Sequence, residues 1–322
     1  MRSKYMTVTE FLTSDHSTAF SFEILPPIRG KSIEGIYREV DRLMEFSPAY
    51  VNITTHRTEK SYHQVDSSTY RLSTTRRRPG TVAIAAMLRE RYGVTPVPHI
   101  ICGEYSRRDI EDQLIDLSYL GITDILVLRG DRERSENRFI AATDGHEHAV
   151  SLARQVVDFN NGIMADGEQT DPVFPPFSFG VAGYPEKHEE AMNLSTDIMY
   201  LKEKVDAGAS YVVTQMFYDN KRYFEFVRLA REAGITVPIV PGLKPLTSLR
   251  QLSMLPRIFH IDFPDALSDE LLRCKSDDDV KRVGVEWGVA QARGLKEAGV
   301  PSIHFYAMHS VGSVAEIARK VY

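Results

Sequence analysis

The sequence lacks the features that mark several large classes of protein. It contains only two cysteines, Cys102 and Cys274, which are far apart and form no C-x-x-C pair. This excludes a disulfide scaffold and a cysteine zinc cluster, and it is typical of a protein of the reducing cytoplasm. No apolar stretch is long enough to span a bilayer, and residues 1–10 contain no signal-peptide core, so we expect a cytoplasmic protein without a membrane partner.

An excess of positive charge and closely spaced glycines are also missing. The 322 residues carry 39 Lys and Arg against 44 Asp and Glu, a net charge of −5, so no nucleic-acid partner is expected. No two glycines are separated by a single residue, which excludes the dinucleotide-binding fingerprint G-x-G-x-x-G. What remains is an α/β enzyme or binding protein for small molecules.

Short β-rich runs alternate with segments of helical period along the whole chain. The predicted strands are Phe20–Ile24, Tyr50–Thr54, Val97–Ile101, Asp124–Leu128, Phe177–Val181, Tyr211–Phe217, Pro238–Val240 and Ser302–Tyr306. Three of these runs follow a glycine that is typical of a helix C-cap, namely Gly121, Gly234 and Gly299.

Eight β-then-α units of this length predict a single (β/α)8 TIM barrel over residues 1–322. The alternative is a doubly wound open sheet, which the missing glycine fingerprint disfavours. No linker or change of composition suggests a second domain, and we expect no regulatory domain. Residues 160–176 are the best candidate for a long surface loop.

Polar residues interrupt the strands on the register that faces the inside of a barrel. In "FSFEILPP", Phe20, Phe22 and Ile24 share one face, whereas Ser21 and Glu23 share the other. A carboxyl group between Phe and Ile loses solvation, so its pKa is expected to rise, as a general acid requires. Asn52, His99, Asp131, Gln215 and His304 also lie in or directly after predicted strands.

Each of these residues also has a structural interpretation, because a lone polar residue near a strand end is more often a cap or a satisfied buried group. Their convergence on one barrel mouth nevertheless favours an active site, since this fold builds its sites there. From the residues alone, the conclusion is a barrel enzyme with a polar mouth.

Two other clusters have plain alternatives. Arg71, Arg76, Arg77 and Arg78 would suit the anionic tail or the phosphate of a ligand, but a solvated loop face is the commoner role. His146-Glu147-His148 opens a predicted helix, where the two histidines diverge, so no metal site is expected.

At these residues the sequence resembles the methylenetetrahydrofolate reductase family, in its short form with a catalytic domain only. The matching phrases run in the family's order from about residue 20 to 306 and include "FSFEILPP", "LVLRGD", "AGYPEKH", "KVDAGASYVVTQMFYD" and "GVPSIHFY". The resemblance implies a (β/α)8 barrel that binds FAD. It also implies a two-step, ping-pong reduction of 5,10-methylenetetrahydrofolate to 5-methyltetrahydrofolate by NADH or NADPH in one-carbon and methionine metabolism. Family members commonly form homo-oligomers.

The resemblance also implies roles for individual residues. Glu23 would be the general acid, and Asp131 would stabilise the cationic folate intermediate beside the flavin. Gln215 and Gln251 would join Glu23 in contacting the folate. The implied FAD contacts are Thr54, His99, Leu128, Arg129, Gly130, Asp131, His148, Ala149, Ala182, Tyr184, His188, Asp197 and Lys204. Without the family phrase, Asp197 and Lys204 would be interpreted as an exposed helix pair.

The sequence departs from the family after the second and the last predicted strands, at Thr55-His56 and at Ala307-Met308. His148 and Leu255 also replace common aromatic residues. An alternative is therefore a non-catalytic or complex-dependent subunit that binds folate or flavin on the same fold. A barrel lyase or aldolase has less support, because no lysine suited to a Schiff base stands out at a predicted strand end.

Overall fold

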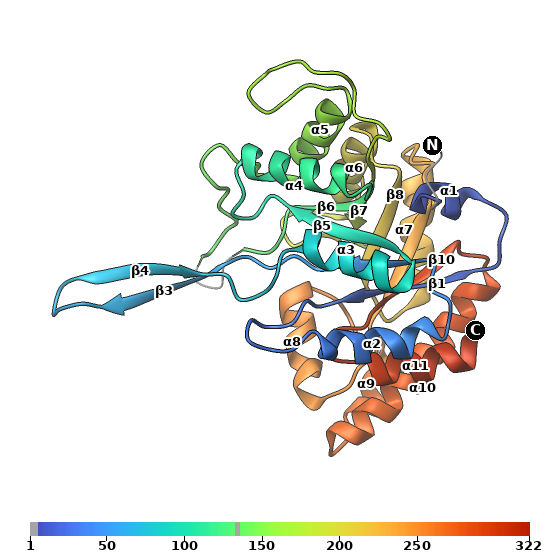
Figure 1. The fold of residues 1–322 in the computed structure, drawn as a ribbon. Coiled ribbons are helices and arrows are strands. Elements are labelled where there is room, and N and C mark those ends of the chain that lie inside the picture. Colours follow the sequence, from blue (N-terminus) through green and yellow to red (C-terminus); the bar gives the residue numbers. More distant parts are fainter. Residues whose placement is uncertain (1–5, 133–135) are drawn as a thin grey trace.

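The computed structural model describes residues 6–132 and 136–322, and its central feature is a closed barrel of parallel strands (Figure 1). Around the barrel the order is β1–β10–β9–β8–β7–β6–β5–β2. The strands are β1 (Ala19–Ile24), β2 (Tyr50–Ile53), β5 (Thr95–Ile101), β6 (Asp124–Leu128), β7 (Ser178–Gly183), β8 (Tyr211–Met216), β9 (Ile239–Leu243) and β10 (Ser302–Tyr306). The predicted (β/α)8 barrel is confirmed, and each predicted strand is present.

The helices lie around this barrel: α1 covers one end, and the others cover the outside (Figure 1). They are α1 (Val8–Thr13), α2 (Glu34–Met44), α3 (Thr81–Tyr92), α4 (Arg107–Tyr119), α5 (Ala149–Asn160), α6 (Leu194–Asp206), α7 (Asn220–Glu232), α8 (Leu249–Phe259), α9 (Asp265–Leu271), α10 (Asp277–Glu297) and α11 (Val311–Val321). Gly121, Gly234 and Gly299 follow α4, α7 and α10 with φ of 67°, 78° and 73°, the left-handed conformation that ends a helix. Asn160 ends α5, and residues 161–176 form a loop with one isolated bridge between Ile163 and Gln169, largely as expected.

Successive side chains of β1 point alternately to the apolar core outside the barrel and to the barrel interior. Phe20 and Phe22 point outward into the large core between strands and helices, whereas Ser21 and Glu23 face the barrel interior. Phe22 is fully buried, and truncating such a ring costs about 3–5 kcal/mol. The outward phenylalanines therefore hold β1 in the register that directs Glu23 inward.

Helix α1 closes the end of the barrel opposite the carboxyl ends of the strands. Val8 and Leu12 pack against Tyr50, Tyr211 and other side chains inside the barrel. In addition, the Val8 backbone N–H donates a 2.9 Å hydrogen bond to the carboxylate of Asp124 at the start of β6. This apolar floor leaves the interior to be reached from the mouth at the other end.

A two-stranded hairpin that the sequence did not predict projects away from the barrel (Figure 1). It consists of β3 (Glu59–Gln64) and β4 (Tyr70–Thr75), paired antiparallel with Tyr62 opposite Leu72. Arg71 lies within β4 and is exposed, so the interpretation of residues 71–78 as a plain loop is wrong for this arginine. The hairpin begins after β2 and returns to α3, and its base lies beside the mouth, where the Arg78 guanidinium bonds to the Pro26 carbonyl.

Gly242→Ala is expected to destabilise the fold by about 2 kcal/mol, because a Cβ at this position would overpack the barrel. It would lie 2.3 Å from the Thr214 carbonyl oxygen and 2.7 Å from the Tyr306 ring. Chemical denaturation measures the free energy of unfolding. The matched control is Gly35→Ala in α2, where nothing lies within 4 Å and a small gain in stability is expected. Equal effects of the two substitutions would contradict the prediction.

Candidate active site

Glu23 lies near the end of β1, with its side chain inside the barrel. It is only 4% exposed, and burial raises the pKa of its carboxyl group to about 8. The carboxyl therefore carries a proton at neutral pH, as the flanking Phe22 and Ile24 led us to expect. A neutral carboxylic acid at a barrel mouth is a proton donor in position to act on a bound molecule.

The imidazole groups around Glu23 supply no positive charge. His99 Nε2 of β5 lies 3.4 Å from Glu23 Oε2, and burial lowers the pKa of His99 to about 3. Burial lowers the pKa of His304 on β10 to about 3 as well, and its Nδ1 lies 3.1 Å from the Ser21 hydroxyl. Both rings are therefore neutral, and the contact between Glu23 and His99 joins two uncharged groups.

The segment after β2 brings a third histidine to the mouth. Thr54 is tied to β1 through a 3.1 Å bond from its N–H to the Ile24 carbonyl, and its hydroxyl lies 3.3 Å from His56 Nε2. Burial and the charge of Arg78 lower the pKa of His56, while the exposed carboxylate of Asp131 counteracts them. His56 was singled out only as a departure from the family pattern, and that departure is the signal that could have marked it.

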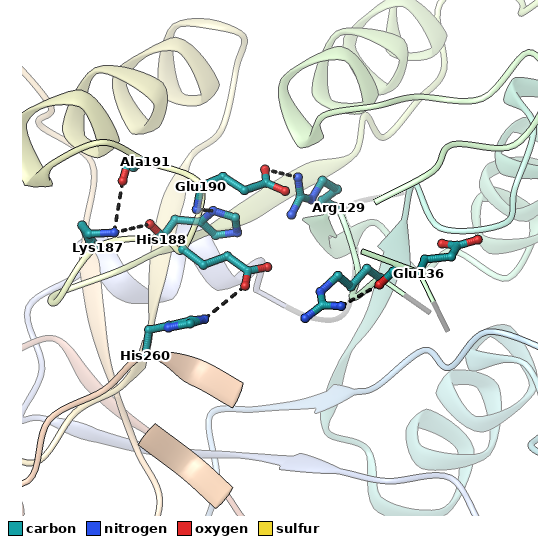
Figure 2. Close-up of polar contacts among 9 residues, drawn as sticks. Arg129, Glu136, Lys187, His188, Glu190, Ala191 and His260 are labelled. Carbon is teal, nitrogen blue, oxygen red and sulfur yellow. Dashed lines mark hydrogen bonds and ion pairs between the residues drawn. The ribbon is translucent and has the colours of Figure 1, made fainter. Parts of the chain in front are cut away.

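The loop after β6 presents a cation and a close backbone at the mouth. Arg129 follows Leu128, the last residue of β6, and pairs with Glu190 (Figure 2), while its guanidinium lies 4.9 Å from the Phe139 ring centroid. Gly130 adopts φ +82°, and a Cβ there would lie 3.3 Å from the Ile101 side chain. Both the left-handed backbone and the close packing against Ile101 favour glycine at this position.

A second set of groups comes from the loop after β7 and from α6. Tyr184 and His188 form an edge-to-face ring contact with centroids 4.8 Å apart. The His188 N–H donates to the Asp197 carboxylate at 3.0 Å, and the Lys204 ammonium donates to the Ala182 carbonyl at 2.6 Å.

Asp197 is buried and Lys204 is half-buried, so neither residue is exposed. Burial raises the pKa of Asp197 and lowers the pKa of Lys204 to about 8, while each charge partly stabilises the other. The interpretation as an exposed helix pair is therefore wrong. A buried lysine next to a backbone carbonyl has donors to offer a bound anion.

The turn that carries these groups is fixed from both sides (Figure 2). Lys187 has φ +83°, and its ammonium donates to the carbonyls of His188 and Ala191 at 3.3 and 3.1 Å. His260, at the end of α8, reaches across to Glu189 with 3.1 Å between Nε2 and Oε2. The segment from 187 to 191 is thereby held against Arg129.

The remaining predicted contacts are less directly placed. His148 is the exposed N-cap of α5, and Ala149 is the first residue of that helix. Gln215 on β8 accepts a bond from the Met216 N–H at 2.9 Å. The Gln251 side-chain oxygen accepts bonds from the N–H groups of Thr247 and Ser248, so it caps α8.

One charged residue of the mouth was missed. Lys244 directly follows β9, and its ammonium donates to the carbonyls of Tyr306 and Met308 at 3.5 and 3.4 Å. No lysine suited to a Schiff base stood out at a predicted strand end, and Lys244 nevertheless occupies such a position after β9. A lysine between strand residue Leu243 and Pro245 was the available signal.

Within the described residues 6–132 and 136–322, no group of three or more His, Cys, Asp or Glu side chains could hold a metal ion. No helix in that part of the chain is long and apolar enough to cross a membrane.

The fold and the site define a (β/α)8-barrel protein with a buried proton donor at its mouth and charged groups around the rim. Residues 8–321 match the family described as methylenetetrahydrofolate reductase, so the chain belongs to this family. This agrees with the resemblance seen in the sequence.

Individual relatives agree with the family match. The chain is 31% identical over 315 residues to a probable methylenetetrahydrofolate reductase (NADPH) of Caenorhabditis elegans, covering 97% of this chain and 43% of that protein. Identity is 29% to methylenetetrahydrofolate reductase (NADH) 1 of Arabidopsis thaliana, over 92% of this chain and 47% of that protein. Identity is 28% to the 5,10-methylenetetrahydrofolate reductase of Pectobacterium carotovorum, over 93% of this chain and 92% of that protein. The chain thus spans about half the length of the eukaryotic relatives and most of the bacterial one.

A solved structure shares the fold. It is an uncharacterized protein from Clostridium thermocellum that binds two copies of 5-methyl-5,6,7,8-tetrahydrofolic acid. The TM-score is 0.54 with 14% sequence identity, and the match covers 95% of each chain.

Proposed function

We propose that this chain reduces 5,10-methylenetetrahydrofolate to 5-methyltetrahydrofolate, with NADH or NADPH as the electron donor and FAD as the carrier. The observation that carries the proposal is Glu23, a buried carboxylic acid that keeps its proton at neutral pH inside the barrel of a chain that belongs to this family. The barrel would constitute the whole catalytic domain.

The residues at the rim fit FAD. Arg129 and Lys204 would face its phosphates, Asp197 would accept a bond from a sugar or adenine group, and Gly130 leaves room for close approach of the backbone. Thr54, His99, Tyr184 and His188 lie at the same mouth. When bound, FAD takes a hydride from the nicotinamide cofactor and supplies it to the folate.

The chain's own part in the folate step is a proton transfer. Glu23 would give its proton to an amine nitrogen of the five-membered ring, the bond from that nitrogen to the methylene carbon would break, and an iminium cation would result. The carboxylate of Asp131 would stabilise this cation, and Gln215 would hydrogen-bond the pterin. Gln251 would contact the folate through its amide nitrogen, because its oxygen caps α8.

Anaerobic spectroscopy tests the proposal. The purified protein should be yellow or should become so on addition of FAD, NADH or NADPH should bleach the flavin band, and methylenetetrahydrofolate should restore it. A colourless protein that cannot be loaded with FAD would overturn the proposal. Flavin binding without turnover by the isolated chain would instead support a complex-dependent subunit.

The folate half-reaction should slow as pH rises. Because burial raises the pKa of Glu23 to about 8, the acid is protonated below this pH and loses its proton above it. The observed rate should therefore be flat near neutral pH and fall about tenfold per pH unit above about 8. Stopped-flow reoxidation of the reduced flavin by methylenetetrahydrofolate measures it. A rate that stays constant through this range would contradict the role of Glu23.

We also propose that the protein self-associates and resides in the cytoplasm. Both cysteines are free, and Cys102 is buried, as is typical of a reducing compartment. Light scattering after size exclusion measures the mass of the particle against the 36.5 kDa of one chain. A particle of monomer mass at all concentrations would contradict self-association.

A further inference from the structure

Proton donation by Glu23 creates a negative charge in a place that is largely shielded from water. Glu23 is 4% exposed, and a carboxylate left without a counter-charge in such a position is costly. The groups that face it are His99 on β5, Asn52 opposite it on β2, and Tyr306 opposite it on β10. None of these three side chains carries a positive charge at neutral pH, since His99 is neutral.

Lys244 comes from the other side of β10. In the barrel, β9 and β1 flank β10, so a residue at the end of β9 reaches β1 only past the end of β10. The Lys244 ammonium does this by binding the carbonyl oxygens of Tyr306 and Met308 at 3.5 and 3.4 Å. Tyr306 is the strand partner of Glu23, so the ammonium lies at the same part of the barrel mouth as the carboxyl group, and its charge acts on that group.

The backbone of Lys244 is fixed as well. The Tyr218 hydroxyl donates a 3.0 Å bond to its carbonyl, and Tyr218 packs edge-on against Phe263 with centroids 4.8 Å apart. Pro245 follows and is buried. These contacts leave Lys244 little freedom to turn toward solvent.

We propose that Lys244 is a positioning residue for Glu23. Its positive charge balances the carboxylate that remains after Glu23 has transferred its proton to the folate. In this step the O–H bond of Glu23 breaks and an N–H bond forms on the substrate. The electron pair of the broken bond stays on the carboxylate, where the charge of Lys244 stabilises it. In support, the charge of Lys244 acts against the effect of burial on the pKa of Glu23, and Glu23 in turn acts against the lowering of the Lys244 pKa by burial.

The charge relation is tested by titrating Glu23 itself. In protein labelled with 13C at the glutamate carboxyls, the signal that Glu23→Gln removes reports the protonation of this residue. The midpoint should lie near 8 in the unaltered protein. It should rise by about one unit in Lys244→Met and stay near the original value in Lys244→Arg. The control Lys202→Met removes an exposed lysine of α6 and should leave the midpoint unchanged. Equal midpoints in the unaltered protein and Lys244→Met would overturn the proposal.

The kinetic consequence rests on the proposed function. Lys244→Met should slow the folate half-reaction up to about tenfold at neutral pH, move its alkaline limb upward, and leave flavin reduction by the nicotinamide cofactor unchanged. Lys244→Arg should restore the rate. If the unaltered protein does not reduce methylenetetrahydrofolate, the proposed function fails, whereas the carboxyl titration still decides the role of Lys244. A folded Lys244→Met that loses both half-reactions equally would show that this lysine is only structural.

Discussion

Glu23→Gln is expected to lower the rate of methylenetetrahydrofolate reduction by about 1,000-fold, because an amide cannot supply the proton that opens the ring. Reduction of the flavin by NADH or NADPH should proceed at nearly the original rate, since that half-reaction needs no acid. Anaerobic stopped-flow measures the two half-reactions separately. The selective loss is the informative result.

Stability provides the control for this substitution. Because the pKa of Glu23 is raised from 4.5 to about 8 in the folded protein, Glu23 lowers the stability of the fold as pH rises between these values. Glu23→Gln should therefore be more stable than the unaltered protein near pH 8, and the difference should shrink toward pH 4.5. The exposed substitution Glu316→Gln should affect neither rate nor stability. Equal losses in both half-reactions would mean that Glu23 is structural.

Lys204→Met is expected to raise the dissociation constant for FAD about 100-fold, because a buried hydrogen-bonding cation is lost from the rim. The loss also removes one of the positive charges that stabilise the Asp197 carboxylate, which adds repulsion toward phosphate. Quenching of flavin fluorescence on titration with the apoprotein measures the affinity.

Lys202 provides the matched control for Lys204. It lies on the same helix, but it is partly exposed and pairs with Asp206 one turn away. Lys202→Met should leave the affinity for FAD within about twofold, as is usual for surface pairs. Equal weakening by the two substitutions would assign the effect to the overall charge of the protein.

The barrel was predictable because its strands repeat a simple pattern. Each repeating unit is a β-rich run followed by a segment of helical period. Within a strand, the alternation of apolar and polar residues, such as Phe22 and Glu23, shows which face points inward. The hairpin was not predictable on the same grounds, because β3 and β4 are polar and pack against no core. Its turn is formed by Asp66, which accepts bonds from the N–H groups of Ser68 and Thr69, rather than by a glycine pair.

The site shows the same division between local and distant information. The raised pKa of Glu23 was predictable because alternation along β1 directs this residue into the buried interior. Lys244 was missed because its strand was predicted to end at Val240. With that boundary, Lys244 lies in a loop, but β9 continues through Pro241 and Gly242 to Leu243. The capping role of Gln251 was visible in advance, since Ser-x-x-Gln at the start of a helix is the pattern of a capping box.

The floor formed by α1 has a practical consequence for chemical footprinting. Among the described residues 6–132 and 136–322, Val8 and Leu12 cover the end of the barrel opposite the mouth, so a water-soluble reagent would have to approach Glu23 from the mouth. Carbodiimides react with protonated carboxyl groups, and Glu23 is protonated at neutral pH. Its labelling, read by peptide mass, therefore reports whether the mouth is open or covered, whatever molecule covers it. A ligand's occupancy can thus be followed even when the ligand has no colour and undergoes no reaction.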